Sequence, residues 1–347
     1  MTCLREMTVG IVNYNGAEVL PDTMTALEQV VSSQTELLLV DDGSDDGSPE
    51  WVERHYPRVR VERMGTNTGR LNRVRNVVLR EANHRLVFLM DNDISPTEGC
   101  LERLADVLLA RDARVLACTP RLVYHDAPDR IYQDGGGLHY LCVSTAGARG
   151  DPVADHPPRP PHPTLGGGVM LIDRQAWRSM GGFDEAYLRG WGDDGEFQLR
   201  GRLRGWEVLH VSDAVCGHVA RPHGPERMTA QIYNRYRTLA TAYSARSLIL
   251  LAPPLLVFEL ALTVLAVFGG FAGTRFRGLG RALSERSEIL RRRRDIQRAR
   301  RVRDGRILEG GSLMHPDAAG RSRLVRVGTR LLASALEAYW KLVRRWI

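Results

Sequence analysis

The chain has 347 residues, and a composition of 43% hydrophobic and 26% charged residues is typical of one or two globular domains. Five scattered cysteines without a CxxC pair argue against a disulfide scaffold or a zinc knuckle and suit a reducing cytosol, and the N-terminus lacks the apolar run of a signal peptide. The net charge is +7, but the segment from Arg275 to Arg306 holds thirteen arginines and four acids, a charge of +9, so the remainder carries −2.

The first 118 residues alternate between apolar runs and segments with helical periodicity. We expect strands over 7–12, 36–40, 59–62, 85–90 and 115–118, and helices over 17–31, 49–55 with Ser48 as its cap, 71–82 and 98–110. This alternation predicts an α/β fold whose mostly parallel sheet is covered by helices on both faces. Ligands of such sheets gather at the carboxyl ends of the strands, where the polar clusters NYN, DDGSDD and DND lie.

The middle of the chain, from 124 to 163, is less regular. Six prolines between 151 and 163 exclude regular structure there, and the segment is either a surface loop or a mobile lid over a substrate. Strand and helix patterns resume after GGG at 166–168 and continue to about residue 218.

The region 248–271 is the most apolar of the chain. After Pro254 it contains seventeen residues with one charge, Glu259, which is at the short limit for a membrane span. Arginines flank it on both sides, and this favours a re-entrant or in-plane helix over a single span. We therefore expect a first domain over 1–240 and a membrane-associating helical region with the arginine-rich segment over 241–347.

Two carboxylates follow the strand 85–90. Because residues two apart in a strand project to the same side, Asp91 and Asp93 can aim at one point if the extended geometry continues. Hard cations such as Mg²⁺ or Mn²⁺ prefer oxygen ligands and often bridge a carboxylate to a phosphate. The alternative is a solvated turn before the next helix.

The order of six motifs resembles the family-2 glycosyltransferases of the GT-A fold, which transfer a sugar from a nucleotide donor. The resemblance covers roughly residues 7 to 240. Its motifs are IVNYNG at 11–16, LLVDDGSDDGS at 38–48, NTGRLNRVRN at 67–76, LMDND at 89–93, GGFDEAYLRGWGDDGEFQLR at 181–200, and His218.

The resemblance implies a donor pocket at the strand ends. Its expected residues are Val12, Asn13, Asp41, Asp42, Asn67, Arg70 and Asn92, with the aspartates holding the base and ribose and Arg70 meeting the diphosphate. An Asx turn is the alternative for Asp41 and Asp42, and a solvated helix face is the alternative for Arg70.

The resemblance also implies a metal site, a base and an acceptor site. A cation, Mg²⁺ or Mn²⁺, is expected on Asp91, Asp93 and His218, where it would neutralise the departing diphosphate; a hydrogen-bonded loop histidine is the alternative for His218. Asp194 is expected as the general base, which implies inversion at the anomeric carbon. Its alternative role is an acidic helix N-terminus.

The acceptor is expected to contact Trp191 and Asp193. Core packing is the alternative for Trp191. The family more often has Glu-Asp where this chain has Asp193–Asp194, and the shorter first acid weakens an acceptor contact carried over to Asp193.

These observations predict a hexosyl- or deoxyhexosyl-transferase at the cytoplasmic face of a bacterial membrane. Its partners would be a nucleotide-diphosphate sugar, the membrane surface, and as acceptor a polyprenyl-linked glycan or another surface-polysaccharide precursor, with no nucleic acid expected. A sugar nucleotidyltransferase typically needs a Gly-rich loop with an Arg and a Lys; NYNG has neither, and no lysine precedes Lys341. A nucleic-acid- or lipid-binding protein using the arginines of 291–303 is a further alternative, and a catalytically inactive relative is the last.

Overall fold

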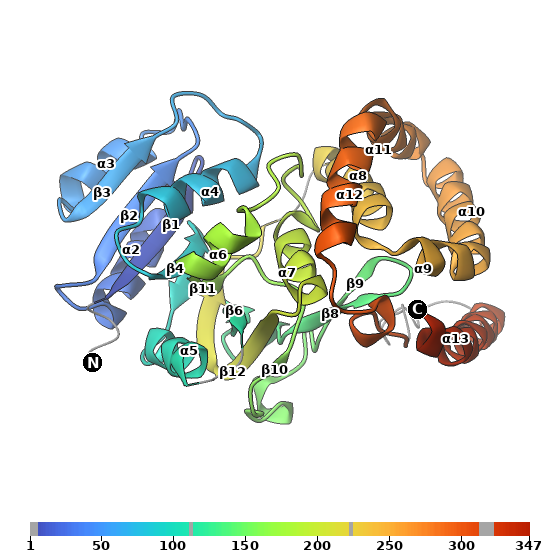
Figure 1. The fold of residues 1–347 in the computed structure, drawn as a ribbon. Coiled ribbons are helices and arrows are strands. Elements are labelled where there is room, and N and C mark those ends of the chain that lie inside the picture. Colours follow the sequence, from blue (N-terminus) through green and yellow to red (C-terminus); the bar gives the residue numbers. More distant parts are fainter. Residues whose placement is uncertain (1–5, 111–113, 222–224, 312–322) are drawn as a thin grey trace. The chain divides into compact units, whose positions relative to one another are not determined.

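The computed structural model describes residues 6–110, 114–221, 225–311 and 323–347 (Figure 1). Their contacts group into two compact units made of discontinuous segments. Unit 1 is Met1–Gly136, Ala146–Gly201 and Trp206–Gly224, and unit 2 is Gly137–Thr145, Arg202–Gly205 and Pro225–Ile347. The boundary predicted between residues 240 and 241 falls inside helix α8 (Pro225–Ala242), which belongs to unit 2.

Unit 1 is built on a ten-stranded sheet in which the order of the main path is β10-β12-β6-β11-β4-β1-β2-β3. The half formed by β4, β1, β2 and β3 is parallel, as predicted. In the other half β12 and β6 are parallel to each other, and only β11 and the short β10 run against them, so most strands of the main path share one direction, as predicted. The strands are β1 (Met7–Asn13), β2 (Glu36–Asp41), β3 (Val59–Arg63), β4 (Leu86–Asp91), β5 (Ile94–Pro96), β6 (Val115–Tyr124), β7 (Ile131–Gln133), β10 (His162–Pro163), β11 (Met170–Asp173) and β12 (Glu207–His218).

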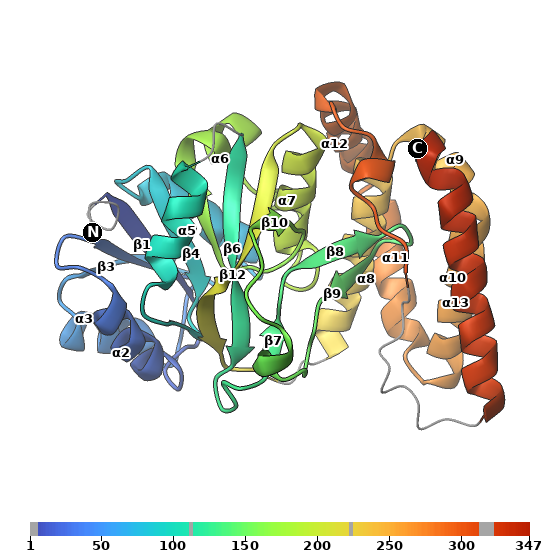
Figure 2. The same ribbon diagram turned by 90° about the horizontal axis from the view of Figure 1, so that it is seen from below.

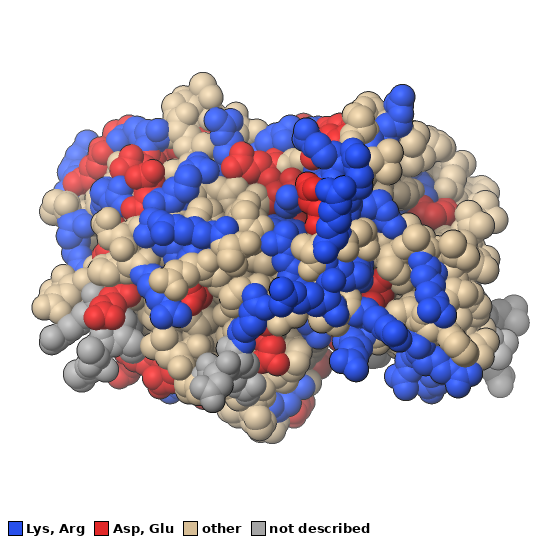
Figure 3. Space-filling view, in the orientation of Figure 1, with Lys and Arg blue, Asp and Glu red and all other residues tan. Residues whose placement is uncertain are grey.

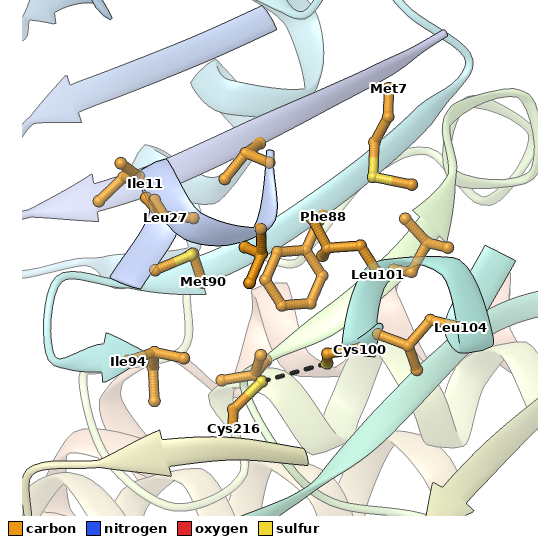
Figure 4. Close-up of a cluster of buried hydrophobic side chains, with 14 of the residues drawn as sticks. Met7, Ile11, Leu27, Phe88, Met90, Ile94, Cys100, Leu101, Leu104 and Cys216 are labelled. Atoms are coloured by element: carbon orange, nitrogen blue, oxygen red, sulfur yellow. Dashed lines mark hydrogen bonds between the residues drawn. The ribbon is translucent and has the colours of Figure 1, made fainter. Parts of the chain in front are cut away.

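Helices cover both faces of this sheet (Figure 2). On one face, α2 (Leu20–Val30), α3 (Ser48–His55) and α5 (Cys100–Leu109) bury apolar side chains against the strands. Figure 4 shows part of this layer, in which Phe88 and Met90 of β4 lie near Leu27 of α2 and Leu101 of α5. On the other face lie α4 (Leu71–Glu81), α6 (Arg174–Met180) and α7 (Asp193–Leu203).

The continuous apolar strands explain this architecture. A strand covered on both faces is mostly apolar, and β1 and the first five residues of β4 are buried at every position. Cys100, Cys118, Cys142 and Cys216 are free and buried, while Cys3 lies outside the described residues.

Three local expectations differ from the structure. Ser48 is the first residue of α3 and not its cap, because Gly47 takes the cap position with φ 76°. Strand β6 continues to Tyr124, past the predicted end at Cys118. The proline-rich segment contains a 3-10 turn, Val153–Asp155, and the two-residue strand β10, which pairs with β12.

Unit 2 is largely helical within its described residues. After α8 come α9 (Ala245–Leu250), α10 (Ala252–Phe268), α11 (Ala272–Ser284), α12 (Arg286–Ala299) and α13 (Arg323–Val343), and the strands β8 (Gly136–His139) and β9 (Val143–Ala146) form a hairpin. Among the described residues, no helix has the length and apolar character required to cross a membrane. The single span that the sequence left open is therefore not found, and the membrane association of this region stays a prediction.

Candidate active site

The three polar clusters of the sequence lie at the carboxyl ends of adjacent strands. Strand β1 lies between β4 and β2, Asn13 is in register with Asp41, and Val12 is in register with Asp91. The parallel strands therefore bring clusters from residues 13, 41 and 91 to one edge of the sheet, as the sequence predicts.

Asn13 is the centre of a buried hydrogen-bond network at this edge. Its amide nitrogen donates to Asp41 Oδ1 at 2.7 Å and to Ser48 Oγ at 3.0 Å. Its amide oxygen accepts from Asn92 Nδ2 at 2.7 Å. Asn13, Asp41 and Asn92, three of the predicted donor residues, are thus brought together, and the network fixes their side-chain orientations.

Asp41 and Asp42 orient two different loops. The carboxylate of Asp41 accepts from the backbone amides of Gly43 and Ser44, which is the turn that the sequence offered as the alternative role. Asp42 accepts from the backbone amide of Thr68 at 3.1 Å, and burial raises its pKa. Gly43 has φ +77°, and a Cβ there would lie 2.6 Å from the Asn67 backbone nitrogen, so this close approach of loops requires glycine.

Asp91 is the last residue of β4, and Asp93 lies in the turn that follows it. Extended geometry stops at Asp91, so the expected placement of the two carboxylates by strand alternation does not hold. Burial and the charge of Asp91 raise the pKa of Asp93. His218 Nε2 lies 3.9 Å from Asp93 Oδ1, so His218 is adjacent to Asp93, and its role as a metal ligand stays a prediction.

The two aspartates present the chemistry that a divalent cation needs. Oδ1 of Asp91 and Oδ1 of Asp93 are buried and have no hydrogen-bond partner among the described residues. Oxygen atoms of this kind are ligands for Mg²⁺ or Mn²⁺, so the residues fit such an ion. In the described part of the chain, no group of three or more histidine, cysteine or acidic side chains is already gathered closely enough to hold a metal.

Arg75 connects the metal motif to the predicted base segment. It comes from α4, is 2% exposed, and its Nη1 lies 3.2 Å from Asp193 Oδ2 while its Nη2 lies 3.8 Å from Asp91 Oδ1. Asn72 Oδ1 accepts a further bond from Arg75 at 3.1 Å. A buried guanidinium thus lies between carboxylates from β4 and from the start of α7 and offsets part of their charge.

Asp193 and Asp194 begin α7 but face different surroundings. Asp193 is buried against Arg75, so its carboxylate is occupied in an ion pair and its acceptor contact stays a prediction. Asp194 is only partly buried. A Cβ added to Gly168 would lie 3.8 Å from Asp194 Oδ2 and 2.9 Å from Arg75 Nη2, so the loop 166–168 passes directly beside the predicted base.

The glycine loop is held in place by α7. Gln198 Oε1 accepts from the Gly166 amide at 2.7 Å, and Gln198 Nε2 donates to the Gly167 carbonyl at 2.9 Å. Gly166 has φ +137° and Gly167 has φ +92°, a conformation that side-chain-bearing residues rarely adopt. The loop therefore presents backbone alone next to Asp194.

The remaining predicted residues lie around this centre. Arg70 donates to the carbonyl of Glu185 at 2.9 Å, and its contact with a diphosphate stays a prediction. Val12 is buried in the core, Asn67 is exposed and accepts from the Gly69 amide, and Trp191 is half-buried. Their contacts with donor or acceptor likewise stay predictions.

Three polar residues of α4 were missed by sequence reasoning. Asn72 donates to the carbonyls of Asp184 and Asp193, and Asn76 donates to the carbonyl of Phe183. Together with Arg75 they hold the 183–194 segment beside the strand ends. Their spacing of i, i+3 and i+4 places all three on one side of the helix. A polar stripe on a helix that also packs against a sheet indicates a buried polar contact, and this was the signal in the sequence.

Comparison with known proteins agrees with this geometry. The sequence profile described as Glycosyl transferase family 2 matches residues 8–174, and that described as N-terminal domain of galactosyltransferase matches residues 153–223. These regions contain the strand-end clusters, the aspartate pair and the 181–200 segment. The nucleotidyltransferase and nucleic-acid-binding alternatives are not favoured by these matches.

Two curated proteins are similar over most of the same region. The chain is 25% identical to the N-acetylglucosaminyl-diphospho-decaprenol L-rhamnosyltransferase of Mycobacterium tuberculosis, over 69% of this chain and 85% of that protein. It is 27% identical to polypeptide N-acetylgalactosaminyltransferase 8 of Drosophila melanogaster, over 64% of this chain but only 39% of that protein.

A solved structure supports the fold. The crystal structure of GalNAc-T7 with UDP, GalNAc and Mn²⁺ superposes with a TM-score of 0.56 at 17% identity, over 70% of this chain. The match spans about half, 48%, of that longer protein. At this identity the likeness establishes the GT-A architecture of the sheet and its helices.

Proposed function

We propose that this chain, which is a family-2 glycosyltransferase, moves a hexose or deoxyhexose from a nucleoside-diphosphate donor to a polyprenyl-linked glycan, with inversion at the anomeric carbon. The observation that carries the proposal is the meeting of Asp91, Arg75 and the Asp193–Asp194 pair at the edge where β1 and β2 end. The proposed metal and donor residues thereby lie next to the proposed base.

The acceptor class rests on a relative. The mycobacterial protein, which matches over most of both chains, is named for transfer of rhamnose to a decaprenyl-diphosphate-linked sugar. A deoxyhexose donor and a lipid-diphosphate acceptor are therefore the first pair to test for this chain.

The residues divide the proposed reaction between them. Asn13, Asp41 and Asn92 orient the nucleotide end of the donor at the strand termini. Asp91 and Asp93 would hold a divalent ion, which when bound supplies positive charge to the diphosphate leaving group. Because Mn²⁺ appears with UDP in the structure of GalNAc-T7, Mn²⁺ and Mg²⁺ are the ions to test.

Asp194 completes the proposed chemistry. The acceptor hydroxyl oxygen attacks the anomeric carbon, the bond from that carbon to the diphosphate oxygen breaks, and Asp194 takes the hydroxyl proton. Arg75 offsets part of the negative charge of Asp193 and Asp91, next to the proposed base.

The test combines binding and transfer. The full chain would be screened with UDP- and dTDP-linked hexoses and deoxyhexoses, with and without Mn²⁺, for a rise in melting temperature, which reports binding to the native state. The stabilising donors would then be incubated with prenyl-diphosphate-linked N-acetylglucosamine, and the product mass and anomer determined by mass spectrometry and NMR.

We expect one donor to stabilise the protein only with the ion, and Asp93→Asn to abolish that ion-dependent part. A retained anomeric configuration, or equal transfer in excess chelator, would contradict the respective assignment. Absence of transfer from every stabilising donor to every lipid-linked acceptor would refute the proposed acceptor class.

A further inference from the structure

The one charge in the apolar region 248–271 points into unit 2. The carboxylate of Glu259, on α10, forms ion pairs with Arg235 of α8 and Arg275 of α11 and accepts from Tyr236 Oη at 2.6 Å. Arg275 also donates to Thr263 Oγ1 at 3.0 Å. This network ties α10 to two neighbouring helices through one polar stripe and removes the charge from the opposite face.

The opposite face of α10 is exposed and apolar throughout. Leu260 is 66% exposed and Phe268 is 87% exposed, whereas Ala266 on the inward side is buried. The spacing of the exposed residues corresponds to one side of a helix. These residues, together the α10 outer face, are Leu256, Val257, Leu260, Ala261, Val264, Leu265, Val267 and Phe268.

Aromatic and arginine side chains accompany both ends of this helix within unit 2. Near its end, Phe276 of α11 is 55% exposed and is followed by exposed Arg277. Beside α9, which precedes α10, the guanidinium of Arg246 lies 5.9 Å from the ring centroid of Trp346, and Arg345 lies 5.3 Å from the same ring. Amphipathic rings and arginines at the ends of an apolar face are typical of segments that lie at a lipid headgroup boundary.

Some arginines of unit 2 are buried or bound to acids and carbonyls, and others are exposed. Arg275 is buried, Arg281 and Arg300 form ion pairs with acids four residues away, and Arg293 donates to backbone carbonyls. An exposed ridge remains on α12, where Figure 3 shows a column of blue side chains. Its members are Arg286, Arg291, Arg294 and Arg298.

We propose that the α10 outer face is the docking surface of this chain for an anionic lipid bilayer, with α10 lying in the plane of the interface. A seventeen-residue helix is about 25 Å long, shorter than the roughly 30 Å hydrocarbon core, and the Glu259 network holds it along unit 2. Exposed arginines add attraction to anionic headgroups. The purpose of this surface rests on the proposed function: it would bring the enzyme to its lipid-linked acceptor.

Vesicle sedimentation tests this surface independently of catalysis. The full chain would be mixed with phosphatidylcholine vesicles with and without phosphatidylglycerol, in low and high salt. Leu260→Glu and Val264→Glu would each be compared with Leu109→Glu, which adds the same charge at a 52%-exposed leucine of unit 1. We expect binding to vesicles that contain phosphatidylglycerol, weakened by salt, and a loss of about tenfold or more in the α10 variants only.

The controls and outcomes distinguish a bilayer from a second copy of the chain on the α10 outer face. Since the substituted side chains are exposed, all variants should melt at the temperature of the parent, and all should transfer sugar equally to a water-soluble, short-prenyl acceptor. A parent chain that stays in the supernatant, or an α10 variant that binds as the parent does, overturns the proposal. A dimer that Leu260→Glu dissociates, without vesicle binding, would instead assign the face to a second copy. Vesicle binding without any sugar transfer would refute the proposed function alone.

Discussion

Asp194 is the residue on which the proposed chemistry depends most directly. Its carboxylate is partly exposed beside the backbone of Gly168, whereas the adjacent Asp193 is turned onto Arg75. For this reason we propose Asp194, and not Asp193, as the group that receives the proton from an incoming hydroxyl.

Asp194→Asn should reduce turnover by about a hundredfold or more, the usual scale for loss of a positioned base, with donor affinity nearly unchanged. Single-turnover rates and donor titration would measure the two effects separately. If donor affinity fell as far as the rate, Asp194 would belong to the donor site.

Arg75 is a positioning residue whose removal should affect stability as well as rate. Arg75→Met leaves the carboxylates of Asp193 and Asp91 without their buried partner, and breaking a buried pair in this way costs about 3–5 kcal/mol. Arg73→Ala, at an exposed position of the same helix, should change the free energy of unfolding by about 0.5 kcal/mol or less.

Denaturant unfolding at neutral pH would compare the Arg75 and Arg73 variants. Equal stabilities would show that Arg75 does not carry the charge balance of the site. Arg75→Lys would add a second comparison, since it keeps the charge but loses the planar fork, and we expect it to recover stability only in part.

At the scale of elements, the sequence predicted the strands better than the contacts between them. The runs 37–40 and 86–90 are apolar at every position, and 7–12 is interrupted only by Thr8 and Gly10, so their burial and their polar ends were visible in the residues alone. The partners of Arg75 were not visible, because Asp193 lies 118 positions away and reaches it only through the packing of α7 against the sheet.

Strand β6 shows a second kind of limit. The strand was predicted to end at Cys118, and Pro120, just beyond, lacks the N–H that donates a ladder hydrogen bond. In the structure, Cys118 is the last β6 residue that pairs with β11, so Pro120 lies where that neighbour has ended. Whether proline ends a strand thus depends on a partner elsewhere in the chain, which local pattern cannot supply.

The proline-rich segment is fastened to the sheet by a buried charge cluster. Arg159 Nη2 lies 3.0 Å from Asp134 Oδ2, and the Arg159 amide donates to Ser212 Oγ at 2.7 Å. Asp134 also pairs with buried Arg121 at 2.9 Å and contacts His210. These contacts favour the surface-loop interpretation of the segment over a freely moving lid.

This cluster should make stability depend on acidity. Burial opposes ionisation of Asp134, but hydrogen bonds from His210 and Arg121 hold its pKa well below the ordinary value of about 3.9. Burial also lowers the pKa of His210, so the positive charge that faces Asp134 comes from arginine. A depressed carboxyl pKa contributes stability that is present above the unfolded value and is lost as the pH falls below it.

Asp134→Asn should therefore lower the free energy of unfolding by about 3 kcal/mol near neutral pH, and by progressively less below about pH 4. Denaturant unfolding over a pH series would measure the difference, with Asp129→Asn, at an 80%-exposed side chain, as the control. A difference that stays constant from neutral to acid pH would assign the cluster a purely steric role.

At the scale of the whole molecule, unit 2 is assembled from parts far apart in the sequence. The ring of Tyr140, from the β8–β9 hairpin, stacks on Trp340 with centroids 5.1 Å apart, and Arg237 of α8 is fully buried against Glu288 of α12. Arg235 depends on Glu259 in the same way. Each of these pairs joins a residue before 246 to one after it.

A truncation after Arg246 should for this reason fail to fold as a stable soluble protein. It would remove the acids that pair with Arg235 and Arg237 together with the helices that cover α8, and so expose a face of α8 that is buried in the full chain, against a total stability that is typically about 5–15 kcal/mol. Soluble yield, near-UV circular dichroism and thermal unfolding of the truncated and full chains would measure the effect. A truncated chain that is monomeric and unfolds cooperatively near the temperature of the full chain would show that the first 246 residues fold independently. If instead it aggregates, loss of membrane binding by truncation would report misfolding, and only point substitutions such as Leu260→Glu can assign the α10 outer face.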